Sequence, residues 1–194
     1  MNSLSSHAWT IDDDGWLHQA IHLPSPNHEG RVDAIDLIVL HNISLPPFEY
    51  QQQGPQQLFQ NALDPSVHPF YTVIQALRVS SHLLIERSGA VTQLVSFQDQ
   101  AYHAGVSSFQ GRERCNGFSI GIELEGCDFE PFTEAQYQAL VPLLAALCQH
   151  YQIEAITGHE DIAPDRKTDP GHFFDWFKLQ QAGLPIIRGQ ADQL

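Results

Sequence analysis

The chain has 194 residues, of which 42% are hydrophobic and 16% are charged, and its formal net charge is −14. A chain of this size buries about 70% of its unfolded surface on folding, so disorder is excluded as a description of the whole. Only nine residues are Lys or Arg, too few for the basic surface of a nucleic-acid-binding protein or for attachment to an anionic membrane. We expect one α/β domain over residues 1–194, with an ordered core at about 15–187 and a loose C-terminal tail.

Three features of the sequence bear on the cellular compartment. No apolar run approaches 18 residues, so no membrane-spanning helix is expected. The first residues, MNSLSSHAWTIDDDGW, have neither a basic region nor a continuous apolar region, which argues against a secretory signal. The cysteines are three in number and include no C-x-x-C pair, which is typical of reduced thiols. A cytoplasmic protein is the simplest interpretation.

The first half of the chain predicts a strand, a short helix and a hairpin. Residues 35–40 (IDLIVL) form a short, continuous, β-branched run, which predicts a strand buried on both faces and ending at His41. After a double proline, residues 55–63 have helical composition and carry a proline that a first turn tolerates. Residues 80–97 predict two strands joined at an Arg-Ser-Gly turn.

Residues 118–125 (FSIGIELE) alternate strictly between apolar and other residues, which predicts a strand with two different faces. The apolar face carries Phe118, Ile120, Ile122 and Leu124, and the second face carries Ser119, Gly121, Glu123 and Glu125. Because small residues on the second face leave room beside the carboxylates, we expect this strand to line a cleft.

The last third predicts a long helix, a strand and a final helix. Thr133 and Gln136 form a capping box, and apolar residues follow at helical spacing as far as residue 151, although Pro142 should kink this helix or remove a hydrogen bond. Residues 153–157 predict a strand that ends just before His159, and residues 172–182 predict a helix. Strands that alternate with helices indicate an α/β fold with a mixed sheet flanked by helices.

Two histidines and one aspartate occupy positions where α/β sheets place ligand groups. His41 and His159 each follow a predicted strand, and Asp169 lies on a tight Pro-Gly turn. Two imidazoles and one carboxylate, with a fourth position open, are what a catalytic zinc ion requires. From spacing alone, three unrelated residues are the simpler interpretation.

The few cations of this acidic chain cluster in two short segments. Arg112 and Arg114 lie in one segment, and Arg166 and Lys167 lie in the other. Such clustering suggests a local anion site, and ordinary surface salt bridges are the alternative.

Five segments of the chain resemble the zinc-dependent N-acetylmuramoyl-L-alanine amidases, and among them the cytoplasmic 1,6-anhydro-N-acetylmuramyl-L-alanine amidases of Gram-negative bacteria. The segments are LIVLHNISLPP, HPFY, LRVSSHLLI, AYHAGVSSFQGRERCNGFSIGIELEG and TGHEDIAPDRKTDPG. The likeness runs from about residue 15 to 177. It implies the fold of phage lysozyme-type amidases and peptidoglycan recognition proteins, one zinc ion, and hydrolysis of the amide between N-acetylmuramic acid and L-alanine during cell-wall recycling. The expected partner is an anhydro-muropeptide substrate, with no obligate protein partner.

The resemblance also assigns residues. By position, His41, His159 and Asp169 match the family's zinc ligands, Glu123 matches its catalytic carboxylate, and Lys167 matches its cation beside the metal. The resemblance implies that Glu123 acts as a general acid and base and that Lys167 stabilises the negative charge of an oxyanion.

Alternatives remain open for both catalytic residues, and the match is incomplete at two places. Glu125 projects on the same face as Glu123, and Lys167 can instead pair with a neighbouring aspartate. Glu160 stands where relatives often have Cys, and the Gln-rich loop 48–57 differs from theirs. The difference in this loop concerns the substrate contacts rather than the chemistry.

The sequence also offers candidates for the residues that contact the substrate. Asn42, Arg78 and Arg114 are candidates for gripping the muramyl and peptide groups, because Arg binds carboxylates bidentately. Tyr102 and His103 are candidates for lining the groove. Holding loops together and packing in the core are the respective alternatives. His68 and His82 are expected to be structural.

Three other functions compete with this hypothesis. A peptidoglycan-binding module would share the scaffold, but such modules usually lack a metal ligand. An iron oxygenase could use His159-Glu160-Asp161, but only His172 lies downstream and the long predicted helix contradicts that fold. An amidase that cuts intact, secreted murein would need an export signal.

Overall fold

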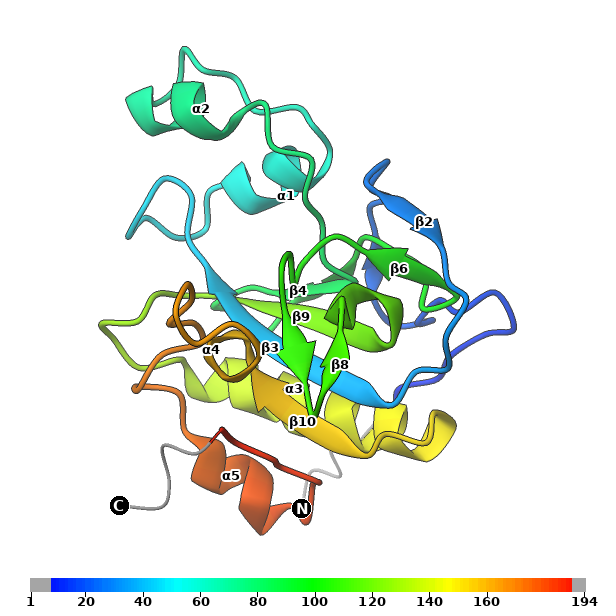
Figure 1. Ribbon diagram of the computed structural model, residues 1–194. Helices are drawn as coiled ribbons and strands as arrows, with labels where there is room; N and C mark the ends of the chain where they lie inside the picture. The colour runs from blue at the N-terminus through cyan, green and yellow to red at the C-terminus, as the bar shows by residue number, and fades with distance from the viewer. Residues whose placement is uncertain (1–7, 190–194) are drawn as a thin grey trace, which may run out of the picture.

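A computed structural model describes residues 8–189, and its centre is a mixed six-stranded sheet (Figure 1). Neighbouring strands are parallel except β4 and β5, which form the predicted hairpin. The strands, in spatial order, are β1 (Ile21–His22), β5 (Val91–Gln93), β4 (Leu83–Ile85), β9 (Ser119–Glu125), β3 (Leu37–Ile43) and β10 (Ala155–Gly158). Two short antiparallel pairs are β2 (His28–Gly30) with β6 (Asp99–Ala101), and β7 (Ser108–Phe109) with β8 (Arg112–Glu113).

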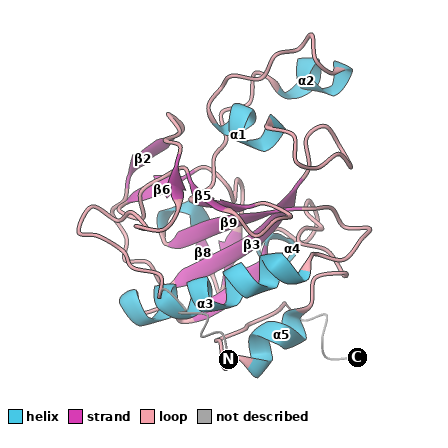
Figure 2. Ribbon diagram, turned by 180° about the vertical axis from the view of Figure 1, so that it is seen from behind, coloured by secondary structure: helices cyan, strands magenta, loops and turns pink. Residues whose placement is uncertain are grey.

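Helices flank this sheet, as the sequence predicted. They are α1 (Gly54–Phe59), α2 (Pro69–Ile74), α3 (Glu134–His150), α4 (His159–Ile162) and α5 (Trp176–Gln181), with a 3-10 turn η1 at Cys115–Gly117. The helices α3 and α5 lie on one side of the molecule, and α1 and α2 lie at the opposite end (Figures 1 and 2). Within the described residues, the structure contains no helix with the length and apolar character needed to cross a membrane.

The two central strands, β3 and β9, have different environments on their two faces. On one face, Ile38 and Ile122 are fully buried in the main core cluster together with leucines of α3. On the other face, Leu37 and Val39 pack with Ala155 of β10 in a smaller cluster. His41 and Glu123 follow the parity of this second face, so they point away from α3.

The helix α3 is the element that the sequence predicted best. The Oγ1 atom of Thr133 accepts the Gln136 N–H at 3.1 Å, and Gln136 Oε1 accepts the Thr133 N–H at 3.0 Å. The helix continues through Pro142, so the expected interruption does not end it. Pro142 lacks one backbone donor, but buried leucines on both sides of it hold the helix against the sheet.

Other predicted elements exist with shifted bounds. The first strand starts at Leu37 and extends to Ile43, the first helix stops at Phe59, and the last helix starts only at Trp176. The prediction that Phe118 shares a face with Ile120 is wrong. Phe118 precedes β9 and packs in the smaller cluster, whereas Ile120 packs in the main core cluster. The chain leaves the strand conformation there, in the turn after η1.

A buried histidine connects β4 to its neighbours. The Nδ1 atom of His82 accepts the Gly121 N–H at 3.0 Å, so the proton lies on Nε2, which donates to the Asp99 carbonyl at 3.1 Å. The Arg31 guanidinium lies 3.0 Å from the same Nε2. Burial, together with the smaller effect of the Arg31 charge, lowers the pKa of His82 to about 3, so the ring is neutral. This agrees with the structural role expected for His82.

The protein should lose stability in acid because of this ring. The pKa of His82 is lower in the folded than in the unfolded chain, so between pH 6.5 and about 3 only the unfolded chain takes up the proton. His82 therefore contributes up to about a tenfold rise in the unfolding constant for each pH unit lowered through that window. Urea titrations of the chelator-treated protein and of His82→Asn, from pH 7 to 4, measure this. Equal pH slopes would contradict the assignment.

Candidate metal centre and active site

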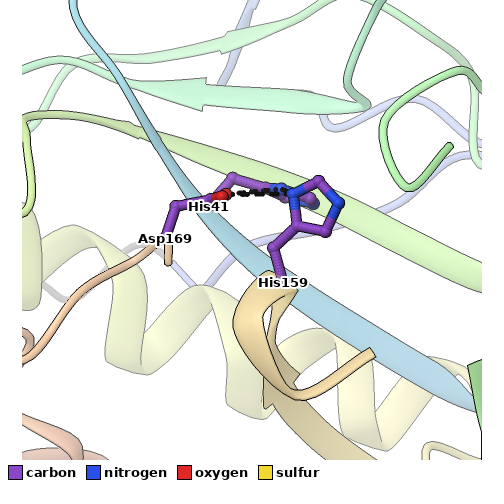
Figure 3. A group of neighbouring side chains, drawn as sticks. All are labelled: His41, His159 and Asp169. Carbon is purple, nitrogen blue, oxygen red and sulfur yellow. Dashed lines mark hydrogen bonds and ion pairs between the residues drawn. The ribbon is translucent and has the colours of Figure 1, made fainter. Parts of the chain in front are cut away.

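His41, His159 and Asp169 meet at the carboxyl end of the sheet (Figure 3). The two Nδ1 atoms of the histidines lie 2.9 Å apart, and each lies 3.1 Å from Asp169 Oδ2. The histidines are brought together because β3 and β10 pair in parallel, with Leu40 opposite Gly158. Both imidazoles are buried, at 1% and 2% exposure.

The protons of this cluster point away from its centre. His159 Nε2 lies 3.1 Å from the Ala104 carbonyl oxygen and therefore donates to it, which leaves the Nδ1 lone pair facing inward. Burial lowers the pKa of His41 to about 4, so this ring is neutral as well.

The donor set fits a divalent cation. Two neutral imidazoles and one carboxylate carry a single negative charge, and their acceptor atoms converge. A tetrahedral ion with bonds of about 2.0–2.1 Å separates its ligands by about 3.3 Å, close to the observed spacing. Three acceptor atoms that face one another in a buried site repel each other, and a bound cation would make this arrangement favourable.

Asp161 does not belong to this centre. Its Oδ2 atom accepts the Thr157 hydroxyl and the Gly158 N–H, both at 2.9 Å, and also contacts Arg188 at 2.8 Å. Because this carboxylate caps α4 and is engaged there, the His-x-Asp pattern does not form the ligand set of an iron oxygenase.

Glu123 lies beside the candidate metal centre, and one of its carboxylate oxygens has no hydrogen-bond partner among the described residues. It sits opposite His41 in the parallel pair of β9 and β3, and its side chain is buried. Its Oε2 atom is the one carboxylate oxygen among the buried side chains of the described residues that lacks a hydrogen-bond partner. Burial raises the pKa of Glu123 well above its usual range, Asp169 adds to this rise, and Lys167 opposes it.

Glu125 is engaged elsewhere, although it projects on the same face. Its Oε2 accepts the Arg87 N–H at 2.9 Å, and its Oε1 accepts the Gln51 N–H. The geometry therefore favours Glu123 over Glu125 for proton transfer.

A cavity of about 560 Å³ contains the cluster and most of the predicted site residues. Its lining includes His41, Asn42, Tyr102, His103, Glu123, His159, Lys167 and Asp169. Lys167 makes no ion pair with Asp165 or Asp169, or with any other acidic residue in the part of the chain that is described. Its ammonium group is therefore available to the cavity, and the pairing alternative is not supported.

Two predicted substrate contacts lie outside this cavity. Arg78 is exposed and donates to the carbonyls of Gln75 and Leu77 at the end of the α2 segment. Arg114 has φ of 62° and lines separate surface depressions. Neither residue lines the cavity that contains the candidate metal centre. Asn42 does line the cavity, but its amide donates to Asp128 and Pro170.

Asp128 is a residue of the site that the sequence reasoning missed. Its Oδ1 accepts from Asn42 at 2.6 Å, its Oδ2 accepts from Thr168 at 2.5 Å, and it lines the cavity. It therefore ties the segment that carries Asp169 to the strand that carries His41. The position just beyond β9 was the available signal, since carboxyl ends of neighbouring parallel strands share one edge.

Comparison with known proteins identifies the class. The family model described as N-acetylmuramoyl-L-alanine amidase matches residues 31–172, and the chain belongs to this family. It is similar to the 1,6-anhydro-N-acetylmuramyl-L-alanine amidase AmpD of Citrobacter freundii, with 50% identity over 89% of this chain and 95% of that protein.

Solved structures agree with the sequence comparison. A crystal structure of an AmpD derivative aligns with a TM-score of 0.86 and 49% identity, covering 89% of this chain and 99% of that one. A complex of the amidase AmiD from E. coli with anhydro-N-acetylmuramic acid-L-Ala-D-gamma-Glu-L-Lys aligns with a TM-score of 0.58 and 29% identity, covering 90% of this chain and 65% of that one. The mixed sheet flanked by helices is confirmed as the fold.

Proposed function

We propose that this protein uses zinc to hydrolyse the amide bond between N-acetylmuramic acid, in its 1,6-anhydro form, and L-alanine of muropeptides. The observation that carries the proposal is the convergence of His41, His159 and Asp169 in one cavity, beside the carboxylate of Glu123, whose Oε2 atom has no partner among the described residues. A relative that is 50% identical bears the name of this activity, which supports the choice of substrate.

Zinc suits the donor set, because two imidazoles and one carboxylate with an open position are typical of catalytic zinc sites. When bound, zinc polarises a carbonyl group and lowers the pKa of a water molecule to about 7. His41, His159 and Asp169 would hold it.

Two residues of the chain transfer the proton and stabilise the intermediate, namely Glu123 and Lys167. The Oε2 atom of Glu123 takes a proton from the attacking water while the oxygen of that water bonds to the lactyl carbonyl carbon. As the C–N bond breaks, the same carboxyl group returns the proton to the L-alanine nitrogen. The ammonium group of Lys167 stabilises the negative oxygen of the tetrahedral intermediate.

The cavity offers a reason why a muropeptide fits. Its lining combines polar side chains, among them Lys167, Asp128 and Thr168, with the apolar side chains of Leu58 and Leu77. A substrate that joins a sugar to a charged peptide requires both kinds of surface. The structure of AmiD with an anhydro-muramyl peptide supports this substrate class.

We place the reaction in the cytoplasm. Cys115, Cys127 and Cys148 are all free thiols, which is typical of a reducing compartment. Anhydro-muropeptides that reach this compartment would then be the working substrate, with intact murein outside.

The test compares two substrates. The purified protein, with zinc content measured by mass spectrometry, is incubated with anhydro-muropeptide and with whole sacculi, and released peptide is quantified. We expect faster release from the anhydro-muropeptide and about one zinc per chain. Preference for sacculi would contradict the recycling function, and hydrolysis without any bound metal would contradict the zinc mechanism.

A further inference from the structure

A chain of three polar contacts leads from His41 away from the metal centre. His41 Nε2 lies 2.9 Å from His103 Nδ1, and His103 Nε2 lies 3.1 Å from Ser119 Oγ. Ser119 Oγ lies 2.6 Å from the carbonyl oxygen of Cys115. Every member is held on or beside β3 and β9, and the chain ends on a backbone carbonyl.

The carbonyl oxygen of Cys115, at the end of this series of contacts, sets the direction of each hydrogen bond in the series. A carbonyl oxygen only accepts, so the single hydroxyl proton of Ser119 points to Cys115. Ser119 Oγ must then accept from His103 Nε2–H, which leaves His103 Nδ1 as an acceptor. His103 Nδ1 in turn accepts from His41 Nε2–H, so His41 Nδ1 carries a lone pair toward the metal centre.

The ring of His103 is built into this position. A Cβ atom at Gly121 would lie 2.6 Å from His103 Nδ1, so the ring needs a glycine under it on β9. The backbone N–H groups of His103 and Ala104 both donate to Asn116 Oδ1, at 3.1 and 2.8 Å. No carboxylate of the described residues contacts the ring, so burial keeps it neutral.

We propose that His103 and Ser119 are positioning residues that hold the proton of His41 on Nε2 and thereby direct its Nδ1 lone pair to the metal. The proposal rests on the proposed metal site. It also changes the expectation for His103, because both of its ring nitrogens are occupied by the protein and neither is free for a sugar or peptide group. Outer partners of this kind orient metal-bound histidines in general.

The first test measures zinc affinity by chelator competition. His103→Leu removes the acceptor, and we expect it to weaken zinc binding by about 10- to 100-fold. His103→Asn is the matched variant, since Asn Oδ1 occupies nearly the position of His Nδ1 and accepts the same proton. We expect it to restore most of the affinity. A folded His103→Leu protein, checked by circular dichroism, that binds zinc as the parent does would overturn the proposal.

The second test needs no damaging variant. In the zinc-free parent protein, ¹⁵N spectra of the imidazole nitrogens should show the proton of His41 on Nε2 and a bare Nδ1. Ser119→Ala, which leaves His103 in place, should raise the share of His41 protonated on Nδ1. A parent protein with the proton on Nδ1, or an unchanged tautomer in Ser119→Ala, would refute the relay. Neither test measures hydrolysis, so failure here is distinguishable from failure of the proposed function.

Discussion

Glu123→Gln is expected to lower kcat by about 10²- to 10⁴-fold while zinc binding persists. The amide fills the same space, but it can neither accept the proton of water nor return one to the leaving nitrogen. The parent carboxylate has an oxygen with no partner among the described residues, so little packing depends on its charge. Peptide release from an anhydro-muropeptide measures turnover, and mass spectrometry measures the metal.

Glu125→Gln is the matched control for this prediction. Glu125 projects on the same face of β9, but its two oxygens accept backbone N–H groups of Gln51 and Arg87. Replacing one oxygen by NH₂ leaves a buried donor facing a donor, which should lower the free energy of unfolding by about 1–3 kcal/mol. Turnover per folded molecule should largely remain. The opposite pattern, with Glu125→Gln inactive and Glu123→Gln active, would reverse the assignment of the catalytic carboxylate.

His159→Ala is expected to remove the metal itself. The substitution deletes one of three ligand atoms and leaves His41 and Asp169, which together hold a divalent ion poorly. Zinc affinity should therefore fall by more than the roughly 10- to 100-fold that the loss of an outer partner costs. Hydrolysis should fall with it, in contrast to Glu123→Gln, which loses turnover alone.

The measurement is chelator competition, with zinc-dependent thermal stability as a second readout. A ligand that binds only the folded chain raises its stability, so added zinc should raise the Tm of the parent and not that of His159→Ala. His150→Ala is the control, because His150 is exposed at the end of α3, away from the cavity. Retention of parental zinc affinity by His159→Ala would rule out the proposed ligand set.

Local signals in the sequence predicted the longer elements well. The capping box at Thr133 and the apolar spacing after it located α3, and the alternation of residues 118–125 located β9, which starts one residue later, at Ser119. The short helices α2 and α4 were not predicted, because one or two turns of helix are too short to show a period. The observed bounds of several elements also differ from the predicted ones, because tertiary contacts decide where a strand or helix ends.

The site shows the same division. Strand ends marked His41 and His159 as candidates, and the parity of β9 set Glu123 and Glu125 on one face. Spacing could not bring Asp169 to His41, which lies 128 residues earlier. Nor could it separate the two glutamates, because that difference lies in the loop residues Gln51 and Arg87 that reach only one of them.

By itself, the sequence determined the polarity of each strand face, the capped helix and the inventory of ligand-type side chains, because these depend on neighbours in the chain. Only the tertiary structure decided the register of β3 between β9 and β10, which sets His41 beside Glu123 and His159. It also decided that Arg78 and Arg114 lie outside the cavity and that His103 contacts His41. These outcomes depend on contacts between distant segments, where a shift of one residue in strand pairing would turn His41 away from its partners.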